Sequence, residues 1–202
     1  RARRLQEAIT AVAIHASISG GEVEEAARLI SETAARALPV ERASVWLFDE
    51  SGEELRCLSL FELTPNRHTE GVVLQLVDYP AYCDALRSGR GIDANDAWAD
   101  PRTREFRDGY LQPLGITSML DAPIRVEGKV VGVVCHEQLG PQRTWQPDEI
   151  TFASGLGDQM AYAILNAARQ RSQEQLQRSR HMLQLVLDHI PQRVYWKDRD
   201  LN

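Results

Sequence analysis

The 202-residue chain has few of the sequence features that mark several large protein classes. Its three cysteines, Cys57, Cys83 and Cys135, lie far apart with no Cys-x-x-Cys pair, which excludes a disulfide framework and a cysteine zinc site and fits a reducing cytosol. No apolar run approaches the roughly 20 residues that span a bilayer, and no signal peptide opens the chain. We therefore expect a cytoplasmic segment without membrane contact, whose parent protein can carry an anchor elsewhere.

Charge and catalytic motifs narrow the function further. The chain carries 23 Lys and Arg against 29 Asp and Glu, and it has no clustered basic run of the kind that binds nucleic acid. Nucleophile elbows, phosphate-binding glycine loops and metal-ligand helices are also missing, and Gly155-Leu156-Gly157 lies inside a predicted helix rather than after a strand. For this ordinary globular composition we predict no catalytic residues, no metal site and no nucleic-acid partner.

The first third of the sequence predicts two helices followed by strands. A narrow apolar stripe predicts a first helix that ends at Gly20-Gly21, and a second helix ends at Pro39. The stripe consists of Leu5, Ile9, Val12 and Ala16. The apolar period then shortens, which predicts strands over residues 43–48, 55–61 and 72–77.

The remaining sequence predicts a lid, a hairpin and a long helix. Residues 91–115 are polar, and a connection of this length is typical of either a functional lid or a disordered insert. The aromatic residues in this segment favour the lid. Residues 117–126 and 129–138 predict a hairpin that turns at Glu127-Gly128. A helix from Pro147 continues into an apolar seven-residue repeat that needs a partner helix. The repeat consists of Leu176, Leu183 and Ile190.

Three segments carry a resemblance to known families. RALPVERASVWLFDESGEELRCLSL and YLQPLGITSMLDAPIRVEGKVVGVVCHEQLGPQRTWQPDEITFASGLGDQMAYAI resemble the GAF domain over about residues 5–170, and LQLVLDHIPQRVYWKDRDLN resembles the start of a PAS domain. The resemblance implies an α+β fold, in which an antiparallel sheet of five or six strands carries the terminal helices on one face and a lid over a pocket on the other. It divides the chain into a GAF sensory domain (1–170), a helical signalling linker (171–190) and a truncated PAS start (191–202).

The register of the hairpin decides which side chains face the pocket. If the turn has two loop residues, Val126 pairs with Lys129 and paired residue numbers sum to 255. The apolar face, against the terminal helices, then carries Leu120 with Cys135, Ala122 with Val133, and Ile124 with Val131. The other face carries Met119 with His136 and Asp121 with Val134. Asp121 and His136 become diagonal neighbours, and such a pair needs solvent, a ligand or a mutual hydrogen bond. A ligand and a simple Asp–His hydrogen bond both stay open.

The resemblance places this face at the floor of the GAF ligand pocket and completes the candidate ligand-binding set. Trp46 has the parity to join the floor, and a lid helix over residues 103–111 contributes side chains from above. Phe106 and Tyr110 serve equally well as plain packing, and Arg107 as a surface charge unless the ligand is anionic. The predicted ligand-binding residues are Trp46, Tyr79, Phe106, Arg107, Tyr110, Met119, Asp121 and His136.

The same resemblance bears on cofactors and activity. Asp78-Tyr79-Pro80-Ala81 and Cys135-His136 are similar to bilin-binding GAF domains, but Phe106 stands where their attaching cysteine lies and Cys135 is expected in the helix-facing core, so we expect no covalent bilin. Leu139-Gly140 replace the Asn-Lys of cyclic-nucleotide GAF domains. Cys83 lacks the second thiol that a sulfoxide reductase would need, and is expected as a buried apolar residue.

GAF followed by PAS is similar to the input side of bacterial sensor histidine kinases and cyclic di-GMP enzymes. We therefore expect a non-catalytic, homodimeric domain that senses an unidentified small molecule and passes its ligand state through the last helix. The dimer is expected to form through the N- and C-terminal helices. The alternative is a ligand-free dimerisation and relay module.

Overall fold

The computed structural model describes residues 1–89 and 91–189, so Ile190 of the predicted repeat and the predicted PAS segment 191–202 lie outside the described residues. A seven-stranded antiparallel sheet in the order β3-β2-β1-β7-β6-β5, with β4 paired to β2, confirms the predicted α+β class. The sheet is wider than predicted because it includes three-residue strands, which are too short to show an apolar period. The strands are β1 (Arg42–Phe48), β2 (Glu54–Glu62), β3 (Arg67–Thr69), β4 (Val73–Gln75), β5 (Ile92–Ala94), β6 (Ile116–Val126) and β7 (Lys129–Leu139).

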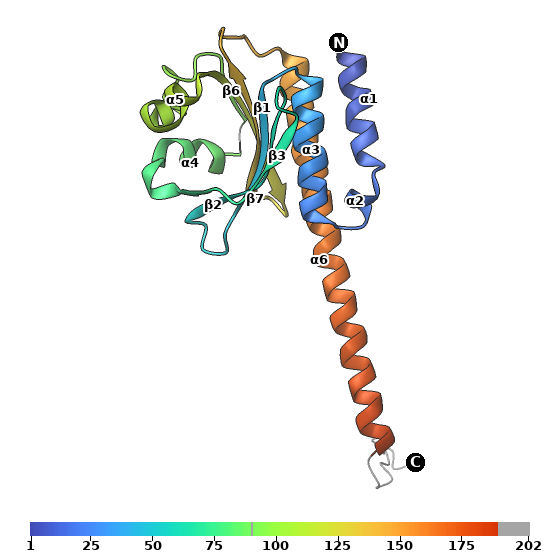
Figure 1. Cartoon of the computed structure of the whole chain (residues 1–202). Helices are drawn as coiled ribbons and strands as arrows, with labels where there is room; N and C mark the ends of the chain where they lie inside the picture. The colour runs from blue at the N-terminus through green and yellow to red at the C-terminus, as the bar shows by residue number, and fades with distance from the viewer. Residues whose placement is uncertain (90, 190–202) are drawn as a thin grey trace. The chain divides into compact units, whose positions relative to one another are not determined.

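Helices cover both faces of the sheet (Figure 1). One face packs against α3 (Val23–Ala37) and the first part of α6 (Pro147–His189), and α1 (Ala2–Ala13) and α2 (Ala16–Ser19) complete this layer. The opposite face is covered by the segment predicted as a lid together with the helix before it. That cover consists of η1 (Leu76–Asp78), α4 (Pro80–Arg87), η2 (Arg104–Phe106), the π-helical η3 (Arg107–Leu111) and α5 (Gln112–Leu114). Each face has its own buried apolar cluster, whereas the sequence predicted an apolar face only against the terminal helices.

The first predicted helix is interrupted, and apolar residues of its stripe pack against the core of the same chain. α1 ends before Ile14, and His15 starts α2 by accepting a hydrogen bond from the backbone N–H of Ser17 at its Nδ1 (3.2 Å). Leu5 and Val12 are buried in the core cluster of the helix-covered face. These two side chains are therefore already packed in their own chain, and the predicted dimer seam cannot use them without unpacking that core.

The register of the hairpin differs from the prediction. The Glu127-Gly128 turn and the Val126–Lys129 pair are confirmed, but Val131 forms a bulge, so that Ile124 pairs with Gly132. From the Ile124–Gly132 pair to the Ser118–Gln138 pair the paired numbers sum to 256. Because a shift of one residue reverses the face of every side chain on the shifted strand, His136 joins the helix-covered face and Cys135 joins the lid-covered face. The predicted Asp121–His136 neighbours and the helix-facing Cys135 are wrong.

Close backbone contacts hold the first part of α6 against the sheet and the N-terminal helices. Gly155 faces Ile9 of α1, and Gly157 faces the carbonyl oxygen of Pro123 in β6, which explains this glycine pair within a helix. Near Ala167, where one compact unit of the chain (Arg1–Ala167) ends, Asn166 donates a hydrogen bond to the carbonyl of Ile18 (2.9 Å). In residues 1–89 and 91–189, no helix has the length and apolarity needed to span a bilayer.

Gly21 offers a test of the contact between the N-terminal helices and α6. Its φ is +64°, and a Cβ there would lie 2.4 Å from the backbone nitrogen of Ala167. We expect Gly21→Ala to lower the free energy of unfolding by about 3 kcal/mol or more, because the strained φ and the backbone clash add. Gly52→Ala is the matched control, since Gly52 has a φ of +73° with open space around it and should lose only about 1 kcal/mol. Urea unfolding measures both; equal losses would rule out the close contact with α6.

Candidate functional site

A small cavity lies between the lid and the sheet. Its volume is about 20 Å³, which is room for about one water molecule. Strands of the sheet supply the floor, and α4, η2 and η3 supply the cover. The lining residues are Trp46, Leu55, Leu74, Tyr82, Phe106, Tyr110, Met119, Val133, Cys135 and Glu137. A ligand larger than water therefore requires the cover to move.

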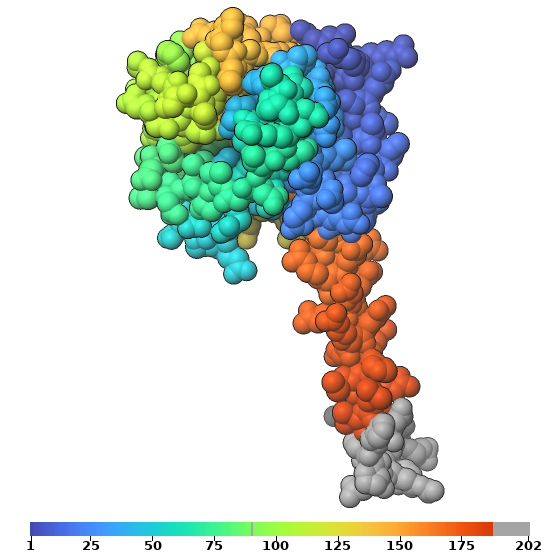
Figure 2. All heavy atoms as spheres, viewed as in Figure 1, coloured from blue at the N-terminus to red at the C-terminus, as the bar shows by residue number. Residues whose placement is uncertain are grey.

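The ring of Phe106 fills the space under the lid. It stacks on Tyr79 with ring centroids 4.1 Å apart and an interplanar angle of 16°, and it meets Tyr82 edge-on at 4.8 Å. Tyr110 completes the aromatic group at 6.2 Å from Phe106. In the space-filling view of Figure 2 the green segments of the cover lie on the side of the unit away from the blue N-terminal helices. Aromatic packing thus closes the site over the sheet.

A carboxylate joins the two parts of the cover. Glu105 in η2 accepts hydrogen bonds from the backbone N–H groups of Ala81 (3.0 and 3.1 Å) and Tyr82 (3.2 Å) at the start of α4. These N–H groups have no partner inside the helix, and the helix dipole favours a negative charge at this end. Glu105 therefore ties the lid to α4, and the two segments can move together.

A buried ionic network ties the lid to the sheet. Glu137 in β7 accepts hydrogen bonds from Arg42 of β1 (2.9 Å) and from the hydroxyl of Tyr110 in η3 (2.7 Å). Arg42 also donates to Glu62 of β2 at 3.0 Å. Burial raises the pKa of Glu137, and the positive charge of Arg42 opposes that rise. The hydroxyl of Tyr110 therefore links the lid to this network, because it donates to Glu137 and accepts from Arg42 at 3.5 Å.

A second buried carboxyl group lies at Asp121 in β6. The hydroxyl of Tyr82 donates to its Oδ2 at 2.7 Å and lies 3.8 Å from the thiol sulfur of Cys135, the residue paired with Asp121 across the hairpin. Oδ1 of Asp121 has no hydrogen-bond partner in residues 1–89 and 91–189. Burial raises the pKa of Asp121 to about 7, even though the Tyr82 hydroxyl favours the ionised form. Tyr82 and Cys135 thus separate a partly unsatisfied acid from the cavity that they line.

His136 lies on the helix-covered face. Its Nδ1 donates to the carbonyl oxygen of Leu120 at 2.7 Å, and its Nε2 has no hydrogen-bond partner in the part of the chain that is described. Burial lowers its pKa to about 4, the Leu120 carbonyl opposes this shift, and the charge of Arg143 adds to it. Arg143 itself pairs with Glu149 of α6 at 2.6 Å. This imidazole belongs to the core beneath the helices and is separated from the cavity by the sheet.

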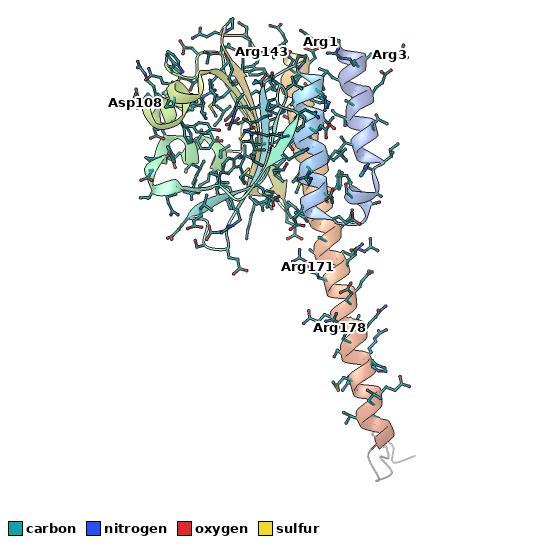
Figure 3. All side chains as sticks on the ribbon, viewed as in Figure 1. Arg1, Arg3, Asp108, Arg143, Arg171 and Arg178 are labelled. Carbon is teal, nitrogen blue, oxygen red and sulfur yellow. The ribbon has the colours of Figure 1, made fainter. Side chains whose placement is uncertain are left out.

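The structure brings together some of the predicted site residues and not others. Trp46, Phe106, Tyr110 and Met119 line the cavity, and Tyr79 supports it from behind Phe106. Arg107 has a half-exposed side chain (52%) whose carboxylate neighbour is Asp108 at 4.0 Å. Asp108 marks the outer edge of the lid in Figure 3. As the prediction allowed, Arg107 is a surface charge.

Sequence reasoning missed three polar residues of the site: Tyr82, Cys135 and Glu137. Cys135 was assigned to the wrong face because the bulge at Val131 has no signal in the apolar pattern of β7, and Glu137 was assigned to no face. Tyr82 follows Tyr79 by three residues on a short amphipathic helix, and this spacing could have placed it on the inner face of α4. No cluster of three or more His, Cys, Asp or Glu side chains in residues 1–89 and 91–189 is arranged to hold a metal ion.

The raised pKa of Asp121 predicts a pH-dependent stability. The folded protein keeps a proton that the unfolded chain loses between about pH 4 and 7, so the contribution of Asp121 to the free energy of unfolding falls as the pH rises through this window. Asp121→Asn removes that loss. We expect the variant to gain stability relative to the wild type by roughly 2 to 4 kcal/mol between pH 4 and 8, as measured by urea unfolding at each pH.

Asp108→Asn is the matched control, because this carboxylate is 94% exposed and should leave the pH profile unchanged. The titration of His136 occurs in both proteins and cancels in their difference. A stability difference between Asp121→Asn and the wild type that stays constant from pH 4 to 8 would show that Asp121 titrates normally.

Solved structures with similar folds come from several kinds of protein. A GAF domain of a phosphoenolpyruvate-protein phosphotransferase from Acinetobacter is 20% identical (83% of this chain, 93% of that chain, TM-score 0.64). Residues 122 to 287 of a methyl-accepting chemotaxis protein are 22% identical (82% and 95%, TM-score 0.61). A far-red absorbing protein in its dark state with bound biliverdin IXa is 15% identical (82% and 99%, TM-score 0.64). At these identities the likeness shows the fold alone.

The sequence itself also matches a known family. Residues 22–164 match the GAF domain, which is more than half of the chain, whereas no curated protein matches it. The match begins beside α3 and ends within α6, so it contains the whole sheet, the lid and the cavity. The chain belongs to the GAF domain family.

Proposed function

We propose that this GAF domain is a non-catalytic, small-molecule-sensing and dimerising regulatory domain of a multidomain bacterial signal-transduction protein. The parent protein would be a cytoplasmic or membrane-anchored sensor histidine kinase or cyclic di-GMP enzyme. Ligand state would pass through α6 to a following PAS domain. The proposal assigns no covalent bilin, because the ring of Phe106 fills the place where the family resemblance puts the attaching cysteine.

The observation that carries the proposal is the polar floor beneath the lid. Asp121 and Glu137 are both buried (0% and 2% exposed), and Oδ1 of Asp121 has no hydrogen-bond partner in the described residues. An unsatisfied buried polar group costs roughly 1 to 3 kcal/mol, and an apolar side chain of similar size would remove that cost. Local violations of this kind concentrate at functional sites. We infer that these polar residues beneath the lid serve to bind a ligand.

In the proposed mechanism the lid has a closed and an open state, and the closed lid of this structure would be the state without ligand. The cavity has room for about one water molecule, and hydrogen bonds from Tyr110 to Glu137 and from Tyr82 to Asp121 join the cover to the sheet beneath it. A ligand that displaces Phe106 would select the open lid, and its differential affinity for that state would set the size of the shift.

The output would run along α6. Beyond Ala167 this helix carries exposed apolar side chains at Leu176 (54%), Met182 (62%) and Leu183 (62%). A seven-residue apolar spacing on an exposed helix is typical of a coiled-coil seam. A second copy of the chain would supply the partner helix, and the dimer would rest on this part of α6 rather than on Leu5 and Val12 of α1.

One observation favours the second candidate, a ligand-free dimerisation and relay module. Phe106 packs against Tyr79, Tyr82 and Tyr110 with almost no space left, as a self-filled pocket would. The two candidates differ in one property, because only a sensor needs a lid that opens. The sulfoxide reductase is not proposed, since Cys83 is 3% exposed and its thiol contacts the carbonyl oxygen of Leu76 at 3.6 Å.

Tyr110→Phe tests the opening of the lid. It removes the hydrogen bond to Glu137 while keeping the ring, so we expect amide hydrogen exchange in residues 104–112 to accelerate about 10-fold, with no change in α3. Tyr162→Phe, at an exposed position of α6 (57%), is the control and should change neither region. Acceleration throughout the domain, or none in the lid, would remove the Tyr110 tether from the mechanism and favour the relay module.

Leu183→Glu tests the dimer. We expect the dissociation constant of the dimer, measured by sedimentation equilibrium, to rise at least about 100-fold because a seam position would have to bury a charge. Arg171→Glu is the matched control, since its exposed side chain lies five residues before Leu176 and therefore off the seven-residue repeat of Leu176 and Leu183. A wild-type chain that stays monomeric, or a dimer that tolerates Leu183→Glu, would refute the seam on α6.

A further inference from the structure

The ligand site has an uneven supply of hydrogen-bonding groups. Its N–H and O–H donors are already engaged inside the protein: Trp46 Nε1 donates to Ser44 (2.8 Å), Tyr82 to Asp121 (2.7 Å) and Tyr110 to Glu137 (2.7 Å). Acceptors, in contrast, remain open. Oδ1 of Asp121 has no partner in the described residues, and each oxygen of a carboxylate such as Glu137 can accept more than one hydrogen bond.

The charges of the site also favour a ligand that donates hydrogen bonds and disfavour an anion. None of the ten side chains that line the cavity is Lys, Arg or His. The nearest positive charge in the network, Arg42, is already paired with Glu62 (3.0 Å) and Glu137 (2.9 Å). An anionic ligand would therefore enter a buried site that is lined by Glu137, has Asp121 behind Tyr82 and Cys135, and offers no uncompensated positive charge, which is strongly unfavourable at low dielectric.

The shape of the site comes from the side chain that now fills it. Phe106 is a flat ring stacked on Tyr79 at 4.1 Å and touched edge-on by Tyr82, so its place fits another flat ring. Tyr82 is also the residue whose hydroxyl reaches Asp121. A ring that took the place of Phe106 would therefore contact Tyr82, the residue that separates Asp121 from the cavity.

Resting on the sensing function proposed above, we propose that the site beneath the lid takes a planar nitrogen heterocycle, neutral or cationic, whose ring N–H or amino groups donate hydrogen bonds to Asp121 and Glu137. Anions such as cyclic nucleotides, phosphates and carboxylates are excluded by the same inventory. The ligand replaces the ring of Phe106 against Tyr79, one donor binds Glu137 at the cavity wall, and a second donor reaches Oδ1 of Asp121 when the hydroxyl of Tyr82 turns aside.

The test uses a ring-sized cavity and three probes of nearly equal shape. Phe106→Ala removes the ring that fills the site, and engineered apolar cavities of this kind bind small aromatic molecules. The probes are 2-aminopyridine (a flat donor), toluene (no donor) and benzoate (an anion), measured by calorimetry. We expect 2-aminopyridine and toluene to bind and benzoate not to bind. Adding Asp121→Asn should weaken 2-aminopyridine about 10-fold and leave toluene unchanged.

Any other result contradicts either the proposed ligand class alone or the ligand class together with the sensing site. Benzoate that binds as well as 2-aminopyridine, toluene that binds alone, or an equal effect of Asp121→Asn on both ring probes would overturn the ligand class while leaving a site beneath the lid. No binding by any probe, to Phe106→Ala or to the milder Phe106→Leu, would overturn the ligand class and the sensing site together. Phe106→Leu serves if Phe106→Ala fails to fold.

Discussion

The site depends on one extra residue in strand β7. Val131 bulges out of the hairpin, Gly132 passes so close to the Trp46 carbonyl of β1 that a Cβ there would lie 2.2 Å from its oxygen, and every later residue of β7 changes face. This shift places Cys135 and Glu137 beneath the lid and His136 beneath the helices. A regular hairpin would put an imidazole under the lid and leave Arg42 without its buried partner. The bulge thus decides the chemistry of the pocket.

The two buried acids under the lid are stabilised in different ways. Glu137 is held by Arg42 and by the lid residue Tyr110, so its charge also helps to close the lid. Asp121 accepts from the hydroxyl of Tyr82 and lies near the thiol of Cys135 and the backbone N–H of His136, and burial raises its pKa to about 7. Glu137 therefore stabilises the contact between lid and sheet, whereas Asp121 keeps one oxygen that can still accept a hydrogen bond. That difference separates a structural ionic network from a candidate recognition group.

The sequence predicted the architecture better than the site. The strands over residues 43–48 and 55–61, the Glu127-Gly128 turn and the helix from Pro147 were read correctly, because their apolar periods and turn residues are local signals. Trp46, Phe106, Tyr110 and Met119, four of the predicted ligand-binding residues, line the cavity, and their binding of a ligand stays a prediction. The faces of Cys135 and His136 were missed, because the apolar pattern of β7 does not show the bulge at Val131. Gly132 beside it was a local signal, since a glycine inside a strand often marks a bulge or a close backbone contact. Tertiary contacts also account for the buried stripe on α1, which the periodicity alone assigned to a dimer.

Sensing requires that the space now filled by Phe106 be exchanged for a ligand, and one measurement addresses this directly. Native mass spectrometry of the protein, purified under non-denaturing conditions from a bacterial host, would show whether a small molecule co-purifies with it. The predicted result is a stoichiometric mass increase that disappears on denaturation and yields a donor-rich nitrogen heterocycle. The bare polypeptide mass alone, after exposure to a broad set of bacterial metabolites, would contradict sensing and leave the self-filled relay module as the function of the domain.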